Sequence, residues 1–174
     1  MGYNTARTQW PSVQSIPDST KNLIDSYFNL LDTNSDHVGD QLVSEIFTPD
    51  AVIYPGPAGA QPIQGSEAIR SMREGAWKVV QKREHVISRV YVFDAAASDL
   101  LLLGEVKQVL HNGKVFVGEW AARIRVVYVA TGDEADGEKG PDSGSNKRLR
   151  IFYHKGWAVS EYLFSIKMAH FLSF

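Results

Sequence analysis

The chain has 174 residues, enough for one domain with a sizeable hydrophobic core. Hydrophobic residues make up 44% and charged residues 22%, which is typical of a soluble globular protein, and the net charge of −2 gives no reason to expect nucleic acid or an anionic membrane as a partner. Since there is no cysteine, disulfides and thiol catalysis are excluded. We find no secretory h-region and no apolar run long enough to cross a bilayer, so we expect a cytoplasmic protein.

The first part of the chain is predicted to hold an arm, two helices and a short strand. A polar arm of residues 1–17 precedes a helix that is capped by Asp18 or Ser19 and ends at Asp32. Hydrophobic residues recur at helical spacing along this helix, so one of its faces should be buried. A turn, a short helix over 39–47 and a strand over 51–54 follow.

The middle of the chain is predicted to form a third helix and a long three-stranded meander. Ser66 caps the helix, whose buried stripe would extend to Val80. Residues rich in Val, Ile, Leu and aromatic side chains predict strands over 83–93, 99–111 and 114–129. Neighbouring strands of this length must twist and coil, which predicts a strongly curved sheet with helices and a pocket on its concave face.

Asn112-Gly113, between the second and third of these strands, is a strong hairpin signal. A two-residue loop there would pair His111 with Lys114 and Glu105 with Trp120. Neither face of the resulting sheet is cleanly polar, and a slip of one residue would exchange the two faces. Which face lines the pocket is therefore left open.

The last part of the chain combines a polar segment, a strand and an apolar tail. Residues 131–146 are rich in Gly, Asp, Glu and Ser, so we expect a mobile, dispensable loop. Alternation over 147–155 predicts a strand, and the aromatic-rich residues 156–174 form a helix or another strand. This tail is too apolar to remain exposed, and it would close the mouth of the cone, join a dimer interface or extend the sheet.

Three local patterns resemble the nuclear-transport-factor-2-like superfamily, in particular the SnoaL-like polyketide cyclases and scytalone dehydratase. Residues 32–54 (DTNSDHVGDQLVSEIFTPDAVIY) are similar to its helix–turn–helix that leads through F-x-P-D-A into the first strand. Residues 65–69 (GSEAI) are similar to the start of its third helix, and 83–86 (REHV) to the histidine that begins its first long strand. The resemblance implies an α+β fold over 18–155, in which a curved, mostly antiparallel sheet wraps around the N-terminal helices as a cone. Residues 131–146 and 156–174 depart from the common pattern.

The resemblance also directs attention to two ionisable residues. His85 falls where the family places a catalytic histidine, and an imidazole can take or give a proton at neutral pH. Asp32 corresponds to a pocket aspartate of proteins similar to scytalone dehydratase, and it could orient His85 or abstract a proton. The residues alone favour a solvent-facing histidine at position 85 and an ordinary turn aspartate at position 32, and only the resemblance raises the catalytic interpretation. We predict that the two side chains line a common cavity.

Further candidates come from the strands and the loop before them. Tyr54 could hydrogen-bond a substrate carbonyl, or it is a core tyrosine. Glu105 lies among leucines, where desolvation would raise the pKa of a carboxyl and suit it to acid–base chemistry, unless Glu105 pairs with Lys107 or faces the convex side. Three aromatic residues are candidates for substrate binding or for the core: Trp77, Tyr91 and Trp120.

The function that the resemblance implies is cofactor-independent acid–base catalysis, as in an isomerase, cyclase or dehydratase. The substrate would be a small, hydrophobic, carbonyl-bearing metabolite of a biosynthetic pathway. The alternative is a non-catalytic module of the same fold that binds a small molecule or acts as a dimeric scaffold. The five histidines have no metal-ligand spacing, so no metal site is expected. We expect a homodimer through the convex face, with an apolar patch of Leu100, Leu102, Val106 and Val117.

Overall fold

The computed structural model describes residues 2–56, 60–130 and 147–158. These residues form two α-helical segments with a π-helical turn, a third short helix and a six-stranded sheet. In chain order the elements are α1 (Asp18–Asp32), α2 (Val38–Gln41), η1 (Leu42–Ile46), β1 (Phe47–Tyr54), β2 (Ile63–Gln64), α3 (Gly65–Ser71), β3 (Val80–Val92), β4 (Asp99–Leu110), β5 (Val115–Ala130) and β6 (Lys147–Ala158). The predicted loop over 131–146 and most of the predicted tail, residues 159–174, lie outside the described residues.

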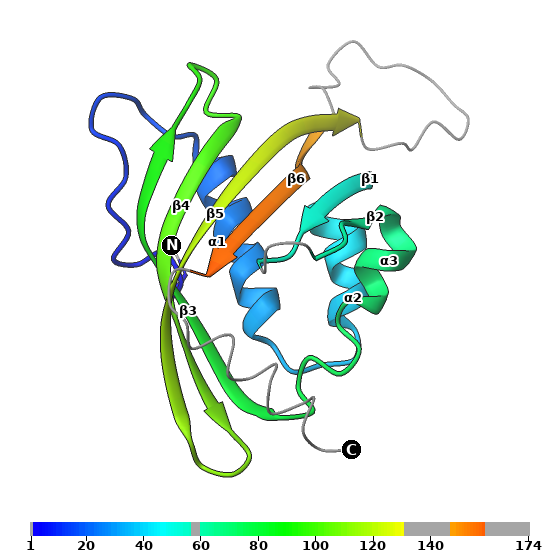
Figure 1. Ribbon diagram of the computed structural model, residues 1–174. Coiled ribbons are helices and arrows are strands. Elements are labelled where there is room, and N and C mark those ends of the chain that lie inside the picture. Colours follow the sequence, from blue (N-terminus) through cyan, green and yellow to red (C-terminus); the bar gives the residue numbers. More distant parts are fainter. Residues whose placement is uncertain (1, 57–59, 131–146, 159–174) are drawn as a thin grey trace.

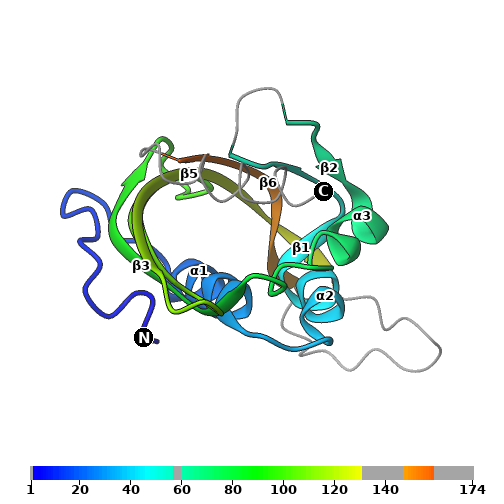
Figure 2. The same cartoon turned by 60° about the horizontal axis from the view of Figure 1, so that its bottom comes forward.

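The sheet is strongly curved, as the long strands predicted. Its strand order is β2-β1-β6-β5-β4-β3, and every neighbouring pair is antiparallel except β1 and β6. Strands β3 to β6 bend around α1, while α2 and α3 lie beside β1 and β2 at the other end of the sheet (Figures 1 and 2). The α+β cone implied by the resemblance is therefore confirmed.

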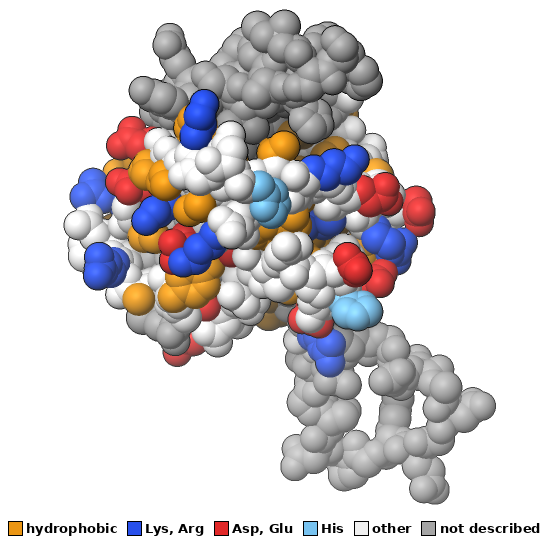
Figure 3. Space-filling model, turned by 90° about the horizontal axis from the view of Figure 1, so that it is seen from below, with side chains coloured by type: hydrophobic (Ala, Val, Ile, Leu, Met, Phe, Trp, Pro, Cys, Tyr) orange, Lys and Arg blue, Asp and Glu red, His pale blue; other side chains and the backbone are white. Residues whose placement is uncertain are grey.

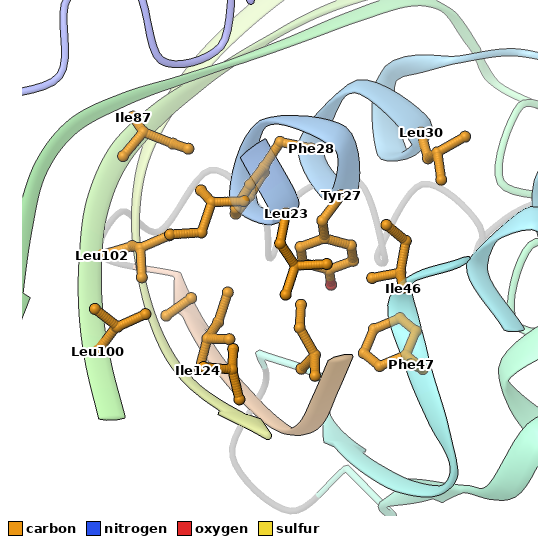
Figure 4. Close-up of a cluster of buried hydrophobic side chains, with 14 of the residues drawn as sticks. Leu23, Tyr27, Phe28, Leu30, Ile46, Phe47, Ile87, Leu100, Leu102 and Ile124 are labelled. Carbon is orange, nitrogen blue, oxygen red and sulfur yellow. The ribbon is translucent and has the colours of Figure 1, made fainter. Parts of the chain in front are cut away.

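Helix α1 fills the concave face of the sheet. Its buried side chains point toward inward-facing residues of β3, β4 and β5, as Figure 4 shows. Each large apolar side chain that is removed from water in this way contributes about 1.5–3 kcal/mol. The labelled core comprises Leu23, Tyr27, Phe28, Leu30, Ile46, Phe47, Ile87, Leu100, Leu102 and Ile124.

Some predicted boundaries are wrong. The third helix ends at Ser71 and gives way to turns around Gly75, whose φ of 74° suits glycine, so β3 begins at Val80. The strand predicted over 51–54 begins at Phe47, because the preceding helix ends in the π-helical turn η1. Strand β6 continues to Ala158, three residues beyond the predicted end.

The predicted register of the β4–β5 hairpin is also wrong, by one residue. The loop holds three residues, because Gly113 N donates to Leu110 O at 2.9 Å and Gly113 adopts a φ of 81°. Glu105 therefore pairs with Glu119, and Trp120 pairs with Gly104. The patch that was expected on the convex face divides accordingly: Val117 is exposed, whereas the other three residues are buried against the core, namely Leu100, Leu102 and Val106.

Bulges in β3 and β6 change which residues face inward. In β3 the pairing shifts between Ile87 and Arg89, so Ser88 is an extra residue that has no partner in β4. In β6 the pairing with β5 shifts so that Phe152 is the extra residue. Along either strand, the alternation of inward-facing and outward-facing residues that holds before the bulge is reversed after it.

The N-terminal arm, residues 2–17, lies along the outer side of β3 (Figure 1). Gln9 N donates to Ser88 O at 2.9 Å, and Gln9 forms a parallel bridge with Arg89. No helix among the described residues is long and apolar enough to cross a membrane. Seen from below, acidic, basic and hydrophobic side chains are interspersed over the described surface (Figure 3).

Candidate active site

Asp32 and His85 meet at the end of α1. Asp32 is the last residue of the helix, and His85 faces inward from β3 opposite the buried Val106. The ring atom Nδ1 of His85 contacts Oδ1 of Asp32, and the backbone N–H of His85 donates to Oδ2 at 2.6 Å. The side chains are 3% and 13% exposed, so this pair is largely withdrawn from water.

The pairing fixes the tautomer of His85. An ionised carboxylate can only accept hydrogen bonds, so Nδ1 carries the proton and donates to Asp32. Nε2 then holds a free lone pair, and among the described residues it accepts no hydrogen bond. This arrangement suits Nε2 to accept a proton from a bound molecule.

Two arginines secure the helix end beside this pair. Arg73 donates to the carbonyl oxygens of Leu31 and Thr33 at 3.3 and 3.1 Å, and Arg83 also donates to Leu31 O. Nε of Arg83 lies 3.7 Å from Oδ1 of Asp32. The carbonyl groups at the end of α1, which have no partners within the helix, thus receive charged donors from the α3–β3 connection and from β3.

The surroundings shift both pKa values downward. Burial by itself would raise the pKa of Asp32, but the hydrogen bonds from His85 and Tyr3 hold it below its usual range. Burial lowers the pKa of His85, and the positive charges of Arg83 and Arg73 act in the same direction against the opposing effect of Asp32. At neutral pH the pair is therefore a carboxylate beside a neutral imidazole.

Aromatic rings surround the imidazole. Phe28 of α1 stacks on Trp120 of β5 with centroids 4.9 Å apart, and the His85 ring lies 5.4 and 5.9 Å from those two rings. The indole can reach across the sheet because its partner in β4 is Gly104. A Cβ there would lie 2.5 Å from the Trp120 ring and 2.3 Å from the carbonyl oxygen of Val86.

His154 is a second inward-facing histidine. It pairs with the buried Ile124 and lies edge-on to Tyr27, with ring centroids 5.6 Å apart. Its Nδ1 is buried and has no hydrogen-bond partner among the described residues. Burial, followed by the nearby His85, lowers the pKa of His154 to about 4.

The structure brings some of the predicted site residues together and separates others. Asp32, His85 and Trp120 form one cluster. Trp77 lies next to that cluster, because the guanidinium of Arg83 sits 4.8 Å from the centroid of its indole ring.

Glu105 does not belong to the cluster. It is exposed on the outer face opposite Glu119, because its neighbours Gly104 and Val106 are the residues of β4 that face inward. Of the alternatives that the sequence left open for Glu105, the structure agrees with exposure on the convex side and not with a carboxylate desolvated among leucines.

Tyr91 and Tyr54 also point away from the cluster. Tyr91 is 42% exposed, because the bulge at Ser88 moves it to the face opposite His85. Tyr54 is 36% exposed and packs on Tyr153, whose neighbour His154 faces the interior.

Sequence reasoning missed several residues that contact the pair or lie close to it. Arg73 and Arg83 had no distinguishing pattern, and the N-terminal Tyr3 and Asn4 were assigned to a polar arm. His154 was missed because alternation does not reveal the bulge at Phe152. Among the described residues, no group of three or more side chains could hold a metal ion.

Comparisons with known proteins bear on the fold. No family model matches the chain, and no curated protein matches it. An NTF2-like protein of unknown function from Exiguobacterium sp. 255-15 is 18% identical, with a TM-score of 0.53 over 78% of this chain and 97% of that one. The fold is NTF2-like.

Two further solved structures that share this fold are named for an activity. One is a hexachlorocyclohexane dehydrochlorinase, 14% identical, with a TM-score of 0.54 over 82% of this chain and 84% of that one. The other is a putative scytalone dehydratase from Novosphingobium aromaticivorans, 11% identical, with a TM-score of 0.52 over 82% of this chain and 83% of that one. At these identities the likeness establishes the NTF2-like fold and leaves the activity to be argued from the site.

Proposed function

We propose that this protein is a cofactor-independent acid–base catalyst in which His85 abstracts a proton from carbon. The observation that carries the proposal is the Asp32–His85 pair, with Nδ1 held by a carboxylate and Nε2 free among the described residues. A neutral, oriented imidazole is the form that a general base requires, and a positioned base of this kind contributes about 10²–10⁴-fold to a rate.

The substrate is a small hydrophobic molecule that bears a carbonyl. Phe28 and Trp120 supply apolar ring surface beside His85, which suits a hydrophobic body. In the proposed step, Nε2 takes a proton from the carbon next to the carbonyl, and the C–H electron pair moves to form an enolate. Reprotonation elsewhere gives isomerisation, attack on an internal electrophile gives cyclisation, and loss of a β-hydroxyl as water gives dehydration.

Asp32 serves in this scheme as the partner that stabilises the imidazolium formed after proton transfer. It also keeps the proton of the resting imidazole on Nδ1. The dehydrochlorinase and the putative scytalone dehydratase are named for eliminations, which also remove a proton from carbon, and their fold lends support to this class of reaction.

The experiment uses a step that all three reactions share. A panel of small ketones and β-hydroxyketones is incubated with the protein in D₂O, and exchange of the α-hydrogen is followed by NMR. We expect protein-dependent exchange that falls about 10²-fold or more in His85→Gln and also falls in Asp32→Asn. The matched control is His37→Gln, because His37 is an exposed histidine before α2 and should leave exchange unchanged.

Equal exchange in the wild type and His85→Gln would contradict the proposal. Binding of panel members without any exchange would favour the alternative, a module that holds a small molecule in the same fold without chemistry.

A further inference from the structure

The N-terminal arm reaches the Asp32–His85 pair. The hydroxyl of Tyr3 donates to Oδ2 of Asp32 at 2.6 Å, and Nδ2 of Asn4 donates to the same oxygen at 3.1 Å. Together with the backbone N–H of His85, these groups place three donors on the carboxylate oxygen that does not contact the imidazole. Within the described part of the chain, no other side chain donates a hydrogen bond to Oδ2 of Asp32.

The arm is fixed at this point by contacts on both sides. Asn4 is fully buried, and its Nδ2 also donates to the carbonyl oxygen of His85 at 2.8 Å. The backbone carbonyl oxygen of Asn4 accepts a hydrogen bond from Ile87 N at 3.0 Å, which ties the arm to β3. Thr5 donates to Asp25 at 2.7 Å, which ties the arm to α1.

We propose that Tyr3 and Asn4 are positioning residues of the active site, which hold Oδ2 of Asp32 so that Oδ1 faces Nδ1 of His85. The arm is then part of the catalytic apparatus, although it lies far from His85 in the sequence. The inference deepens the proposed function and rests on it only for the effect on catalysis, since the hydrogen-bond network itself can be measured without substrate.

The proposal has a defined electrostatic consequence. Hydrogen bonds to a carboxylate favour its ionised form, so losing one raises its pKa. With one donor lost, the carboxylate of Asp32 forms stronger hydrogen bonds with the donors that remain, including Nδ1 of His85. The stronger bond to Nδ1 stabilises the imidazolium and therefore raises the pKa of His85 as well. Among the described residues, the other charged or titratable groups that face this pair are Arg73, Arg83 and His154, and Tyr3→Phe changes none of these side chains.

The experiment compares Tyr3→Phe with the wild type by NMR titration of the Asp32 carboxyl carbon and the His85 ring. We expect the pKa of Asp32 to rise by about one unit and that of His85 by a few tenths. Tyr3 is 48% exposed, so removal of its hydroxyl leaves the core intact. Tyr128→Phe is the matched control, because Tyr128 is 54% exposed and its hydroxyl hydrogen-bonds Ser19, away from the pair.

A second variant, Asn4→Ala, should move both pKa values in the same direction. Unchanged titration of Asp32 and His85 in Tyr3→Phe would overturn the proposal, even if thermal stability fell, because a merely structural contact would lower stability without moving the pKa values. If the pKa values shift but no substrate undergoes exchange, the proposed function fails while the positioning role stands. If exchange depends on His85 but the pKa values do not shift, the proposed function stands and the positioning role fails.

Discussion

Asp32 occupies a position where a carboxylate is electrostatically unfavourable. The C-terminal end of a helix carries a partial negative charge, and acidic residues there cost about 0.3–1 kcal/mol. The structure compensates with donors from Tyr3, Asn4 and His85 and with the nearby guanidinium of Arg83. Such an arrangement is not needed to end a helix, which supports a functional reason for the aspartate.

The sequence allowed Asp32 and His85 to be predicted together only through the resemblance to a family. Their separation along the chain carries no local signal, because contact between the end of one helix and the start of a strand depends on the fold. Tyr3 and Asn4 were not predicted, since polar residues in an N-terminal arm have no periodicity that reveals a partner.

His154 should make stability depend on pH. Its folded pKa of about 4 lies below the value of 6.5 for an unperturbed histidine, so the unfolded chain takes up the proton first. Stability is therefore fully present above pH 6.5 and falls as the pH drops toward 4, by up to about 3 kcal/mol. We expect His154→Phe to flatten this dependence, as measured by urea unfolding at several pH values in that window.

His85 contributes to the same window in the same direction, because its folded pKa is also lowered, so part of the slope should remain in the variant. Asp32 acts at lower pH, since its contribution is lost only as the pH falls through its own depressed pKa. His37→Phe is the matched control and should keep the full slope. An identical slope in His154→Phe and the wild type would contradict the prediction.

At the scale of elements, hydrophobic periodicity was sufficient to find α1 and the four long strands, but it did not determine which residues face inward. The Asn112-Gly113 signal correctly located a hairpin, yet the glycine closes a three-residue loop and the register moved by one. The bulges at Ser88 and Phe152 accompany the bending of the sheet around α1. Strand length predicted the curvature, but the positions of these bulges depend on how the sheet packs on α1, so local sequence does not reveal them.

The connection between β5 and β6 is expected to be dispensable. Ala130 pairs with Lys147, so the strand ends already lie side by side and a short turn can join them. Residues 131–146 contain no aromatic residue and no Val, Ile, Leu or Met. Each halving of a loop changes its closure free energy by only about 0.6 kcal/mol. Replacement of these residues by a four-residue Gly-Ser turn should shift the thermal midpoint by only a few degrees, which circular dichroism would measure.

A variant with a shuffled 131–146 sequence of unchanged length is the control for composition. Loss of many degrees in the shortened protein, with little change in the shuffled one, would show that the length of this segment is needed. Loss in both would show that its specific side chains bind or pack.

At the scale of the whole molecule, the cone covers only one face of its sheet with α1. The outer face carries exposed apolar side chains among charged ones such as Glu105, Lys107 and Glu119. Side chains of this kind that are more than a third exposed include Val86, Tyr91, Val115, Val117, Val127 and Trp157. Several exposed apolar side chains on one face of a sheet are a common sign of an interaction surface.

We predict that the protein is a homodimer through this outer face. In a two-fold interface the same face of each copy meets the other. The apolar side chains of one copy would pack on those of its partner, and Lys107 of one copy would pair with Glu105 or Glu119 on the other. Val117→Asp should weaken the dimer, because Val117 is 55% exposed and the new carboxylate would lose its hydration and apolar contact on entering the interface. Val13→Asp is the matched control, since Val13 is 96% exposed on the arm.

The measurement is the mass by light scattering at micromolar concentration, combined with the thermal midpoint of each variant. A dimeric wild type and Val13→Asp with a monomeric, folded Val117→Asp would support the outer face as the interface. A wild-type protein that is monomeric under these conditions would contradict the prediction. A Val117→Asp variant that remains dimeric would place the interface elsewhere and leave the outer face free for another partner.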